Sequence, residues 1–200
     1  ILIATGGTGG HVFPAYSLAK NLIKNDYKVE IVTDQRGFKF LEKYKDLKIK
    51  INNSTTIFKK TFFSVIWSIV IIFFSYLKSL IILYKTKPSL VFGMGGHASF
   101  PLCLAAKTLN ISFIIYENNL LLGKSNRYLI PLASKIFLAY KDVEGIELKF
   151  KSKVVMHSAQ IAESLTEASG LDLFESIIGD MDSIMGLPIK KIKEYLDSIK

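Results

Sequence analysis

Two short glycine-rich segments, each followed by a histidine, contain the residues in this sequence whose types and spacing suit a binding or catalytic site. The first, at 6–10, reads Gly-Gly-Thr-Gly-Gly and precedes His11. The second, at 93–96, reads Gly-Met-Gly-Gly and precedes His97. Glycine permits positive φ angles and lets a ligand approach the backbone closely. Where such a turn leads into a helix, the free N–H groups and the helix dipole favour a phosphate or diphosphate.

The first glycine segment differs from two better-known phosphate-binding motifs. A dinucleotide fingerprint that uses Gly7 needs a third glycine where the sequence has Val12. A P-loop needs lysine after its last glycine, whereas His11 follows Gly10. A tight strand-to-helix turn without a ligand remains an alternative. At the start of a helix, His11 would face a ligand as a general base, although a lone histidine is more often structural.

A polar segment, Tyr116-Glu117-Asn118-Asn119, follows a later apolar run. Polar side chains at the carboxyl end of a strand suit a sugar or nucleotide site. Glu117 is equally compatible with capping a helix or bracing a loop. The single cysteine, Cys103, excludes a disulfide and a cysteine-based metal site, and we expect neither a metal nor a cofactor.

The elements that must position these residues alternate along the chain. Apolar runs predict strands at 1–5, 29–33, 49–51, 90–92, 112–116 and 135–138, and helical periodicity predicts helices at 14–25, 38–44, 62–84, 100–109 and 123–132. This order indicates an α/β fold with a Rossmann-like parallel sheet and helices on both faces. Such sheets bind ligands beyond the carboxyl ends of their strands.

The pattern changes beyond residue 153. A helical segment at 158–169 is followed by two strand-like runs at 171–178 and 182–185. A last helix is expected after Pro188, with Ile189, Ile192, Leu196 and Ile199 facing inward. We therefore expect a first domain over 1–150 and an appended, short α+β tail over 151–200.

The chain is basic, with a formal net charge of +9, and half of its residues are hydrophobic. A basic surface suits nucleic acid, an anionic membrane or a phosphorylated substrate, or only keeps the protein soluble. No nucleic-acid recognition motif accompanies the lysines, so we expect no nucleic-acid partner. The start at Ile1 lacks the features of a signal peptide, which favours a cytoplasmic location, and we expect a few residues to precede it.

The segment from Phe62 to Tyr84 is the most apolar part of the chain and contains one charge, Lys78. Three interpretations compete: a membrane-spanning helix, a buried core helix, and a helix that lies on a membrane surface. A span would place the two flanking parts of one sheet on opposite sides of a bilayer. We favour a partly buried helix with a membrane-facing side, next to the basic side chains Lys59, Lys60, Lys78, Lys85 and Lys87.

Together these residues resemble the MurG family. The matching motifs are GGTGGHVFPA at 6–15, GMGGHASFP at 93–101, YENN at 116–119 and KSNRYL at 124–129. The resemblance covers about residues 1–150 and implies the first of the two Rossmann-like domains of a GT-B fold. It also implies an inverting transfer of N-acetylglucosamine from UDP-GlcNAc to lipid I (undecaprenyl-pyrophosphoryl-MurNAc-pentapeptide), which forms lipid II for peptidoglycan.

The resemblance assigns a role to each motif residue. His11 would be the catalytic residue, because it matches the family histidine proposed as a base or an acceptor-site residue. The acceptor diphosphate would rest on Gly6, Gly7, Gly93, Gly95 and Gly96. The donor UDP-GlcNAc would contact Thr8, Gly9, Gly10 and Asn119. Glu117 and Asn126 would be polar residues of the cleft. The family's apolar patch with basic neighbours implies peripheral attachment to the cytoplasmic face of the anionic inner membrane through the segment from Phe62 to Tyr84.

The sequence also departs from the family. His97 stands where tyrosine is common, and Tyr116 where histidine is common. The family's second domain, which supplies most contacts to the donor, would lie beyond about residue 155, where the sequence is too short to hold it. We therefore expect the isolated chain to be inactive. Residues of about 170–199 instead resemble the end of the Maf family of nucleotide pyrophosphatases, as in a fused or misassembled reading frame. Alternative functions are therefore a non-catalytic lipid- or membrane-binding module and, ranked lower, a nucleotide pyrophosphatase.

Overall fold

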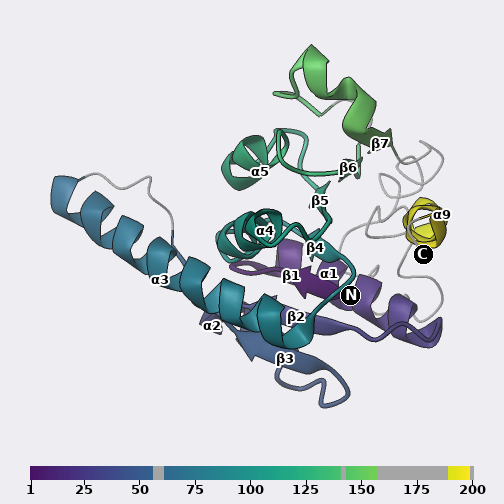
Figure 1. Ribbon diagram of the computed structural model, residues 1–200, viewed down its shortest axis with the longest axis horizontal. Coiled ribbons are helices and arrows are strands. Elements are labelled where there is room, and N and C mark those ends of the chain that lie inside the picture. Colours follow the sequence, from purple (N-terminus) through teal and green to yellow (C-terminus); the bar gives the residue numbers. More distant parts are fainter. Residues whose placement is uncertain (56–60, 141–142, 157–188, 199–200) are drawn as a thin grey trace, which may run out of the picture.

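The computed structural model describes residues 1–55, 61–140, 143–156 and 189–198. Its centre is a sheet of seven parallel strands in the order β3-β2-β1-β4-β5-β6-β7 (Figure 1). The strands are β1 (Leu2–Ala4), β2 (Glu30–Thr33), β3 (Lys48–Ile51), β4 (Val91–Gly93), β5 (Phe113–Glu117), β6 (Lys135–Leu138) and β7 (Val154–Met156). The predicted parallel sheet is confirmed, and the predicted strands agree with the observed ones to within two residues at each end.

Helices cover both faces of the sheet, as the strand composition requires (Figure 1). Ile3 of β1 faces a core formed with α1 (Gly9–Lys24) and α2 (Gln35–Leu41). Leu2 of the same strand faces the opposite core. That core is formed with α3 (Phe62–Thr86), α4 (Ser99–Thr108) and α5 (Lys124–Leu129). Successive side chains point to opposite faces, which explains why the strands read as continuous apolar runs.

Two helices begin earlier than the sequence pattern predicted. Helix α1 starts at Gly9, five residues before Pro14, where we expected its start. Proline is favoured in the first turn because it lacks an N–H, but here it lies inside the helix. Helix α2 starts at Gln35 because the side chain of Asp34 caps it, accepting a hydrogen bond from the Gly37 N–H at 2.7 Å.

The long helix α3 is attached to the body by its carboxyl-terminal half. Asn52, after β3, donates its Nδ2 to the Ser75 carbonyl at 3.0 Å and to Ser79 Oγ at 2.8 Å. Tyr76 pairs with Thr108 of α4 through their hydroxyls at 3.0 Å. The amino-terminal half projects beyond the sheet (Figure 1). The interpretation of this segment as a buried core helix is therefore wrong, and only 22% of its most apolar window is buried.

The sheet continues past residue 150, where we expected the first domain to end, because β7 pairs with β6. The predicted last helix is present as α9 (Ile189–Ser198). Its residues Ile192 and Leu196 are buried in the core on the α1 face. The centroids of the Tyr195 and Phe137 rings lie 6.5 Å apart in an edge-to-face arrangement. The predicted elements between 158 and 185, and most of the Maf-like segment, lie outside the described residues.

Candidate functional site

The two glycine segments meet where the strand order of the sheet reverses. β1 and β4 are hydrogen-bonded neighbours, and the chain leaves β1 toward β2 on one side and β4 toward β5 on the other. Parallel sheets open a ligand crevice at such a switch point, outside the carboxyl ends of the strands. The first glycine loop (6–10) follows β1, and the second glycine loop (93–96) follows β4. The fold therefore places both loops at this crevice.

The second glycine loop needs glycine because other backbone passes against it. Gly95 and Gly96 have φ angles of +84° and +78°, which disfavour any other residue. A Cβ on Gly96 would collide with the Gly6 carbonyl oxygen of the first loop. A Cβ on Gly95 would lie 2.9 Å from the His11 ring. The first loop and His11 therefore pack directly against the backbone of this loop.

His11 lies in the first turn of α1, between the two loops. Thr5 Oγ1 donates to its carbonyl at 2.9 Å, which fixes the backbone there. Its Nδ1 is buried and has no hydrogen-bond partner among the described residues. Burial lowers the pKa of His11 below its ordinary value of 6.5, and the Glu117 carboxylate and a hydrogen bond with the Met94 backbone partly offset this. The imidazole is consequently neutral at pH 7, the state that a general base requires.

Glu117 braces the loop after β5. Its Oε1 accepts hydrogen bonds from the Asn119 N–H at 3.1 Å and from Asn119 Nδ2 at 2.7 Å. Its Oε2 accepts from the Gly123 N–H at 2.7 Å and from Asn126 Nδ2 at 3.0 Å. Four donors satisfy a carboxylate that is only 1% exposed. Glu117 therefore has the structural role that the sequence left open beside a role in a ligand site, and it also lines the pocket described below.

Asn118 links this braced loop to the first glycine loop. Its Nδ2 donates to the Gly10 carbonyl at 2.5 Å. In a regular helix that carbonyl would accept from the N–H four residues later, which Pro14 lacks. Asn118 therefore supplies the donor that the proline removes. It lies in the predicted polar segment 116–119, but no role was assigned to it from the sequence. A proline four residues after a glycine at a helix start is a sequence signal for such a missing donor.

Asp34 holds the other side of the first glycine loop and was also missed. Its Oδ1 accepts from the Gly7 N–H at 3.2 Å as well as from Gly37. Its Oδ2 lies 3.3 Å from Nη2 of Arg36. The Gly7 N–H is therefore used within the protein. For anions, the first loop offers the start of α1, where no side chain caps the helix and the first turn contains no acidic residue.

A pocket of about 210 Å³ lies against the second glycine loop. It brings together six of the predicted site residues: His11, Gly95, Gly96, Glu117, Asn119 and Asn126. His97, Gly123, Lys124 and Ser125 complete its lining. Asn126 Oδ1 is buried there without a partner among the described residues. The pocket thus combines a lysine with a neutral imidazole and an unpaired amide oxygen, which suit a polar ligand that can donate hydrogen bonds.

The other predicted site residues lie outside the lining of this pocket. Thr8 and Gly10 are exposed at the start of α1, and Gly9 is partly exposed. Gly93 is buried at the end of β4, where a Cβ would lie 2.7 Å from Cys103 Sγ. Its glycine is explained by core packing against α4, so its expected role in binding a diphosphate has no support from its position.

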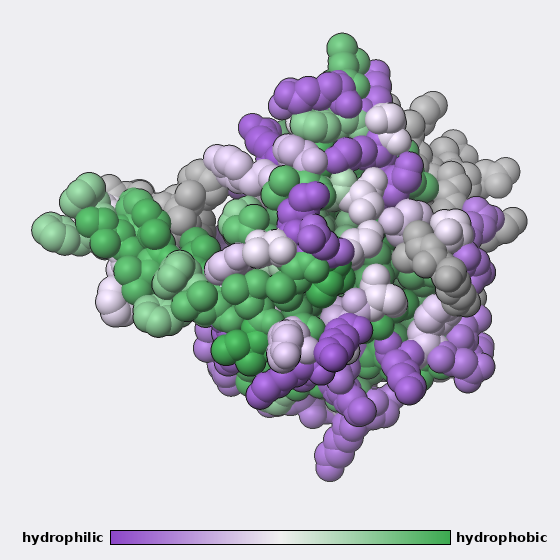
Figure 2. All heavy atoms as spheres, viewed as in Figure 1, coloured by the Kyte–Doolittle hydropathy of each residue, from purple (hydrophilic) through white to green (hydrophobic). Residues whose placement is uncertain are grey.

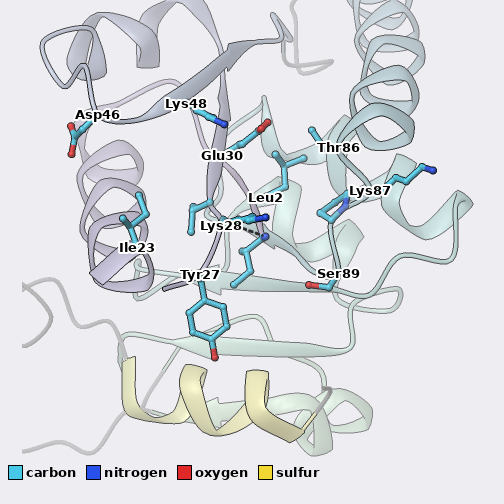
Figure 3. Close-up of a pocket in the computed structure, with 13 residues that line it drawn as sticks. Leu2, Ile23, Tyr27, Lys28, Glu30, Asp46, Lys48, Thr86, Lys87 and Ser89 are labelled. Carbon is cyan, nitrogen blue, oxygen red and sulfur yellow. Dashed lines mark hydrogen bonds between the residues drawn. The ribbon is translucent and has the colours of Figure 1, made fainter. Parts of the chain in front are cut away.

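A larger cavity of about 540 Å³ lies at the amino ends of β1 and β2 (Figure 3). Ile1 and Leu2 line it together with Tyr27, Lys28 and Lys87. Its lining includes the charged residues Lys28, Glu30, Asp46, Lys48 and Lys87 (Figure 3). It lies at the end of the sheet opposite the glycine loops. The smaller pocket, where buried polar atoms converge at the switch point, is therefore the better candidate site despite its size.

Comparisons with known proteins show the family to which this chain belongs. Residues 1–138 match the family described as the glycosyltransferase family 28 N-terminal domain. A Pelagibacter ubique protein is 38% identical over 154 residues, which are 77% of this chain and 42% of the relative. Its name is UDP-N-acetylglucosamine--N-acetylmuramyl-(pentapeptide) pyrophosphoryl-undecaprenol N-acetylglucosamine transferase. A Rickettsia akari protein with the same name is 34% identical over all of this chain and 50% of its own length.

A solved structure supports the fold. The crystal structure of Acinetobacter baumannii MurG matches 84% of this chain and 49% of its own chain, with a TM-score of 0.64 and 22% sequence identity. The chain spans about half the length of the relatives that it matches. The alignment with the Rickettsia akari relative extends across the tail that we expected to resemble the Maf family.

Proposed function

This chain belongs to glycosyltransferase family 28, whose N-terminal domain it contains, and we propose that it forms the acceptor-binding half of a peptidoglycan glycosyltransferase. The transferase would move N-acetylglucosamine from UDP-GlcNAc to lipid I, the reaction for which its relatives are named. The observation that carries the proposal is the contact between the two glycine loops at the switch point, with His11 between them.

His11 is the proposed base. An inverting transfer requires a group that removes the proton from the acceptor hydroxyl as it attacks the sugar donor. The lowered pKa of His11 keeps the imidazole neutral and ready to accept that proton. Glu117 lies near enough to stabilise the imidazolium that forms, because its carboxylate raises the pKa of His11. The braced loop after β5 would thus support the proton transfer.

The donor half of the reaction needs groups beyond those described. Most contacts to the donor in a two-domain transferase come from the second domain, and the chain spans about half of its relatives. From this half, Thr8, Gly9, Gly10 and Asn119 remain the proposed donor contacts. We expect the isolated chain to transfer little or no N-acetylglucosamine. Transfer of radiolabelled N-acetylglucosamine to a lipid I analogue at an enzymatic rate would contradict this expectation.

Binding of the acceptor can be tested directly. A ¹⁵N-labelled chain would be titrated with a soluble lipid I analogue that carries a short prenyl chain. We expect the amide signals of Gly9, Gly10 and His11 to shift, and those of α9 to stay unchanged as an internal control. A chimera of residues 1–156 with the second half of the Pelagibacter ubique relative tests the base: His11→Asn should lower kcat by about 10²-fold or more. Unshifted loop signals would contradict the proposal.

The exposed face of α3 supports a second component of the proposal, attachment to a membrane surface. Serines point inward, with Ser68, Ser75 and Ser79 buried, whereas large apolar side chains point outward. This is the reverse of the usual surface helix. Figure 2 shows the projecting part of α3 as a continuous hydrophobic surface. Over the whole of α3, the exposed large apolar side chains are Phe62, Phe63, Ile66, Trp67, Ile69, Phe73, Phe74, Leu77, Ile81 and Tyr84.

An exposed apolar face of this size indicates an interaction site. The exposed cations Lys78, Lys85 and Lys87 favour an anionic surface as the occupant. An exposed apolar face that is rich in aromatic side chains and flanked by lysines is the kind of surface that enters a membrane interface. We therefore place the protein at the cytoplasmic face of the cell membrane as a peripheral protein, with the acceptor lipid within reach of the crevice.

Liposome co-sedimentation tests this attachment. We expect more chain to sediment with phosphatidylglycerol vesicles than with phosphatidylcholine vesicles, and Trp67→Ser with Phe74→Ser to abolish the difference. Leu148→Ser is the matched control, because Leu148 is 76% exposed but lies outside α3. Equal binding to both vesicle types would contradict an anionic membrane as the partner. Self-association in sedimentation velocity, removed by the α3 variant alone, would assign the face to a second copy.

A further inference from the structure

The amino-terminal turn of α2 lies beside the first glycine loop. Asp34 ends the connection from β2 and holds two backbone N–H groups, one from Gly37 in α2 and one from Gly7 in the loop. Gly37 permits this approach, because a Cβ there would collide with Thr33 and meet Asp34 at 3.3 Å. Any ligand that reaches the loop at Gly7 therefore also reaches the first turn of α2.

The Gly7 N–H is not free to bind a ligand anion. It donates to the Asp34 carboxylate at 3.2 Å, and Gly7 itself has a φ of +89°. The Asp34 side chain is only 5% exposed, so its negative charge is held close behind the loop. An anion at this point would meet that charge without a backbone donor from Gly7. Binding there needs a cation.

Arg36 is positioned to be that cation. Its Nη2 lies 3.3 Å from Asp34 Oδ2 and 3.5 Å from where a Gly7 Cβ would be. The guanidinium thus lies beside Gly7. Its side chain is 63% exposed, so it is accessible to a ligand. The contact with Asp34 uses one N–H of a group that carries five, which leaves donors in the fork geometry that matches a phosphate.

We propose that Arg36 binds a phosphate of the diphosphate acceptor on the first glycine loop, an inference that rests on the proposed function. The α1 amino terminus and Arg36 then supply the positive charge on this side of the crevice, where α1 has no acidic residue in its first turn. His11 packs on the second loop instead, against Gly95. Arg36 acts in binding, so its removal weakens binding of the acceptor by this chain, and in the two-domain chimera it raises KM for the acceptor and leaves kcat nearly unchanged.

If Arg36 had only a structural role, Arg36→Ala would lower the stability of the chain, whereas a role in binding leaves the stability unchanged. An exposed ion pair contributes little to stability, and Asp34 keeps both of its backbone donors when Arg36 is removed. Arg36→Ala should therefore unfold at the same urea concentration as the wild type. Lys24→Ala is the matched control, because Lys24 is an exposed cation in the last turn of α1, at the far end from the glycine loops.

The test compares two ligands by NMR titration of the 200-residue chain. One is the short-chain lipid I analogue, and the other is the same muramyl peptide without its diphosphate. For the analogue, we expect Arg36→Ala to raise Kd about tenfold, Arg36→Lys to raise it less, and Lys24→Ala to leave it unchanged. For the ligand without phosphate, Arg36→Ala should change nothing.

The outcomes separate this inference from the proposed function. If the wild-type chain binds the analogue and Arg36→Ala binds it equally well, the role of Arg36 is wrong and the acceptor site stands. Equal weakening by Arg36→Ala and Lys24→Ala would also overturn it, since net charge alone would explain the effect. Equal weakening toward both ligands would rule out the phosphate as its target. If the wild-type chain does not bind the analogue, both proposals fail.

Discussion

The two glycine loops have similar sequences but different environments. The second loop is mostly buried, and Gly95 and Gly96 adopt positive φ angles against His11 and the Gly6 carbonyl. In the first loop, Gly10 is exposed, and the atoms nearest to a Cβ on Gly10 would lie 3.9 Å away. The second loop therefore needs glycine for the fold, whereas the latter part of the first loop has room that a ligand can use.

This difference shows that a glycine motif has at least two separable roles. One role is close backbone packing, which no substitution can preserve. The other is access to N–H groups at a helix start, which depends on which neighbours already use them. Asp34 and Asn118 occupy two backbone groups of the first loop: Asp34 accepts a hydrogen bond from the Gly7 N–H, and Asn118 donates one to the Gly10 carbonyl.

The largest expected effect contrasts a glycine from each loop. Gly96→Ala should lower the free energy of unfolding by about 3 kcal/mol, through a strained φ and a collision with the Gly6 carbonyl. Gly10→Ala should stay within about 1 kcal/mol of the wild type, because alanine is favoured in a helix and nothing obstructs its Cβ. Urea denaturation measures both. Similar losses in the two variants would remove the distinction between the loops.

A smaller loss is expected from the residue that ties the first loop to α2. Asp34→Ala removes the acceptor of the Gly7 and Gly37 N–H groups and should cost about 2 kcal/mol of unfolding free energy. Asp46→Ala is the control, because it removes only an exposed ion pair with Lys20 and should leave the urea midpoint in place. If Asp34→Ala is as mild as the control, the loop does not depend on this anchor.

The link between Asn118 and the first loop is testable as a double-mutant cycle. Asn118→Ala should cost about 1 kcal/mol, because the Gly10 carbonyl loses its donor. Pro14→Ala restores a backbone N–H that can reach this carbonyl. In that background Asn118→Ala should cost much less. Additive effects in denaturation experiments would show that Asn118 does not compensate for the proline.

The smallest expected effect is a change in the slope of stability against pH. His11 has a lowered pKa in the folded chain, so below about pH 6.5 the unfolded chain binds a proton that the folded chain excludes. Its contribution to stability is present above the ordinary pKa and is lost as pH falls below it. His11→Asn should flatten this slope relative to the wild type, as measured by urea denaturation at several values between about pH 5 and about pH 7. An unchanged slope would mean that packing against the second glycine loop does not desolvate His11.

The sequence predicted most of the fold because its signals are local. Apolar runs such as 135–138 identified strands, and β6 has those limits. The boundaries that failed depended on distant groups. Helix α1 extends back to Gly9 because Asn118, far along the chain, satisfies the carbonyl that Pro14 leaves. Strand β7 was missed because its three residues become a strand only by pairing with β6.

The same limit applies to the site. Glycine content identified both loops, and the histidine after the first loop identified His11. Periodicity did not reveal that Gly93 packs on Cys103, since that contact joins a strand to a neighbouring helix. Asp34 and Arg36 belong to no motif in the first glycine segment. They reach it only because β2 lies beside β1 in the sheet.

By itself, the sequence determined the alternation of strands and helices, the two glycine turns and the apolar character of α3, because each is encoded in consecutive residues. The tertiary structure alone decided which hydrogen-bonding groups of those turns remain free. It did so through strand order, which places β4 beside β1 and brings the second loop under the first. Whether a glycine turn binds a ligand or only packs depends on such neighbours, which lie far away in the chain.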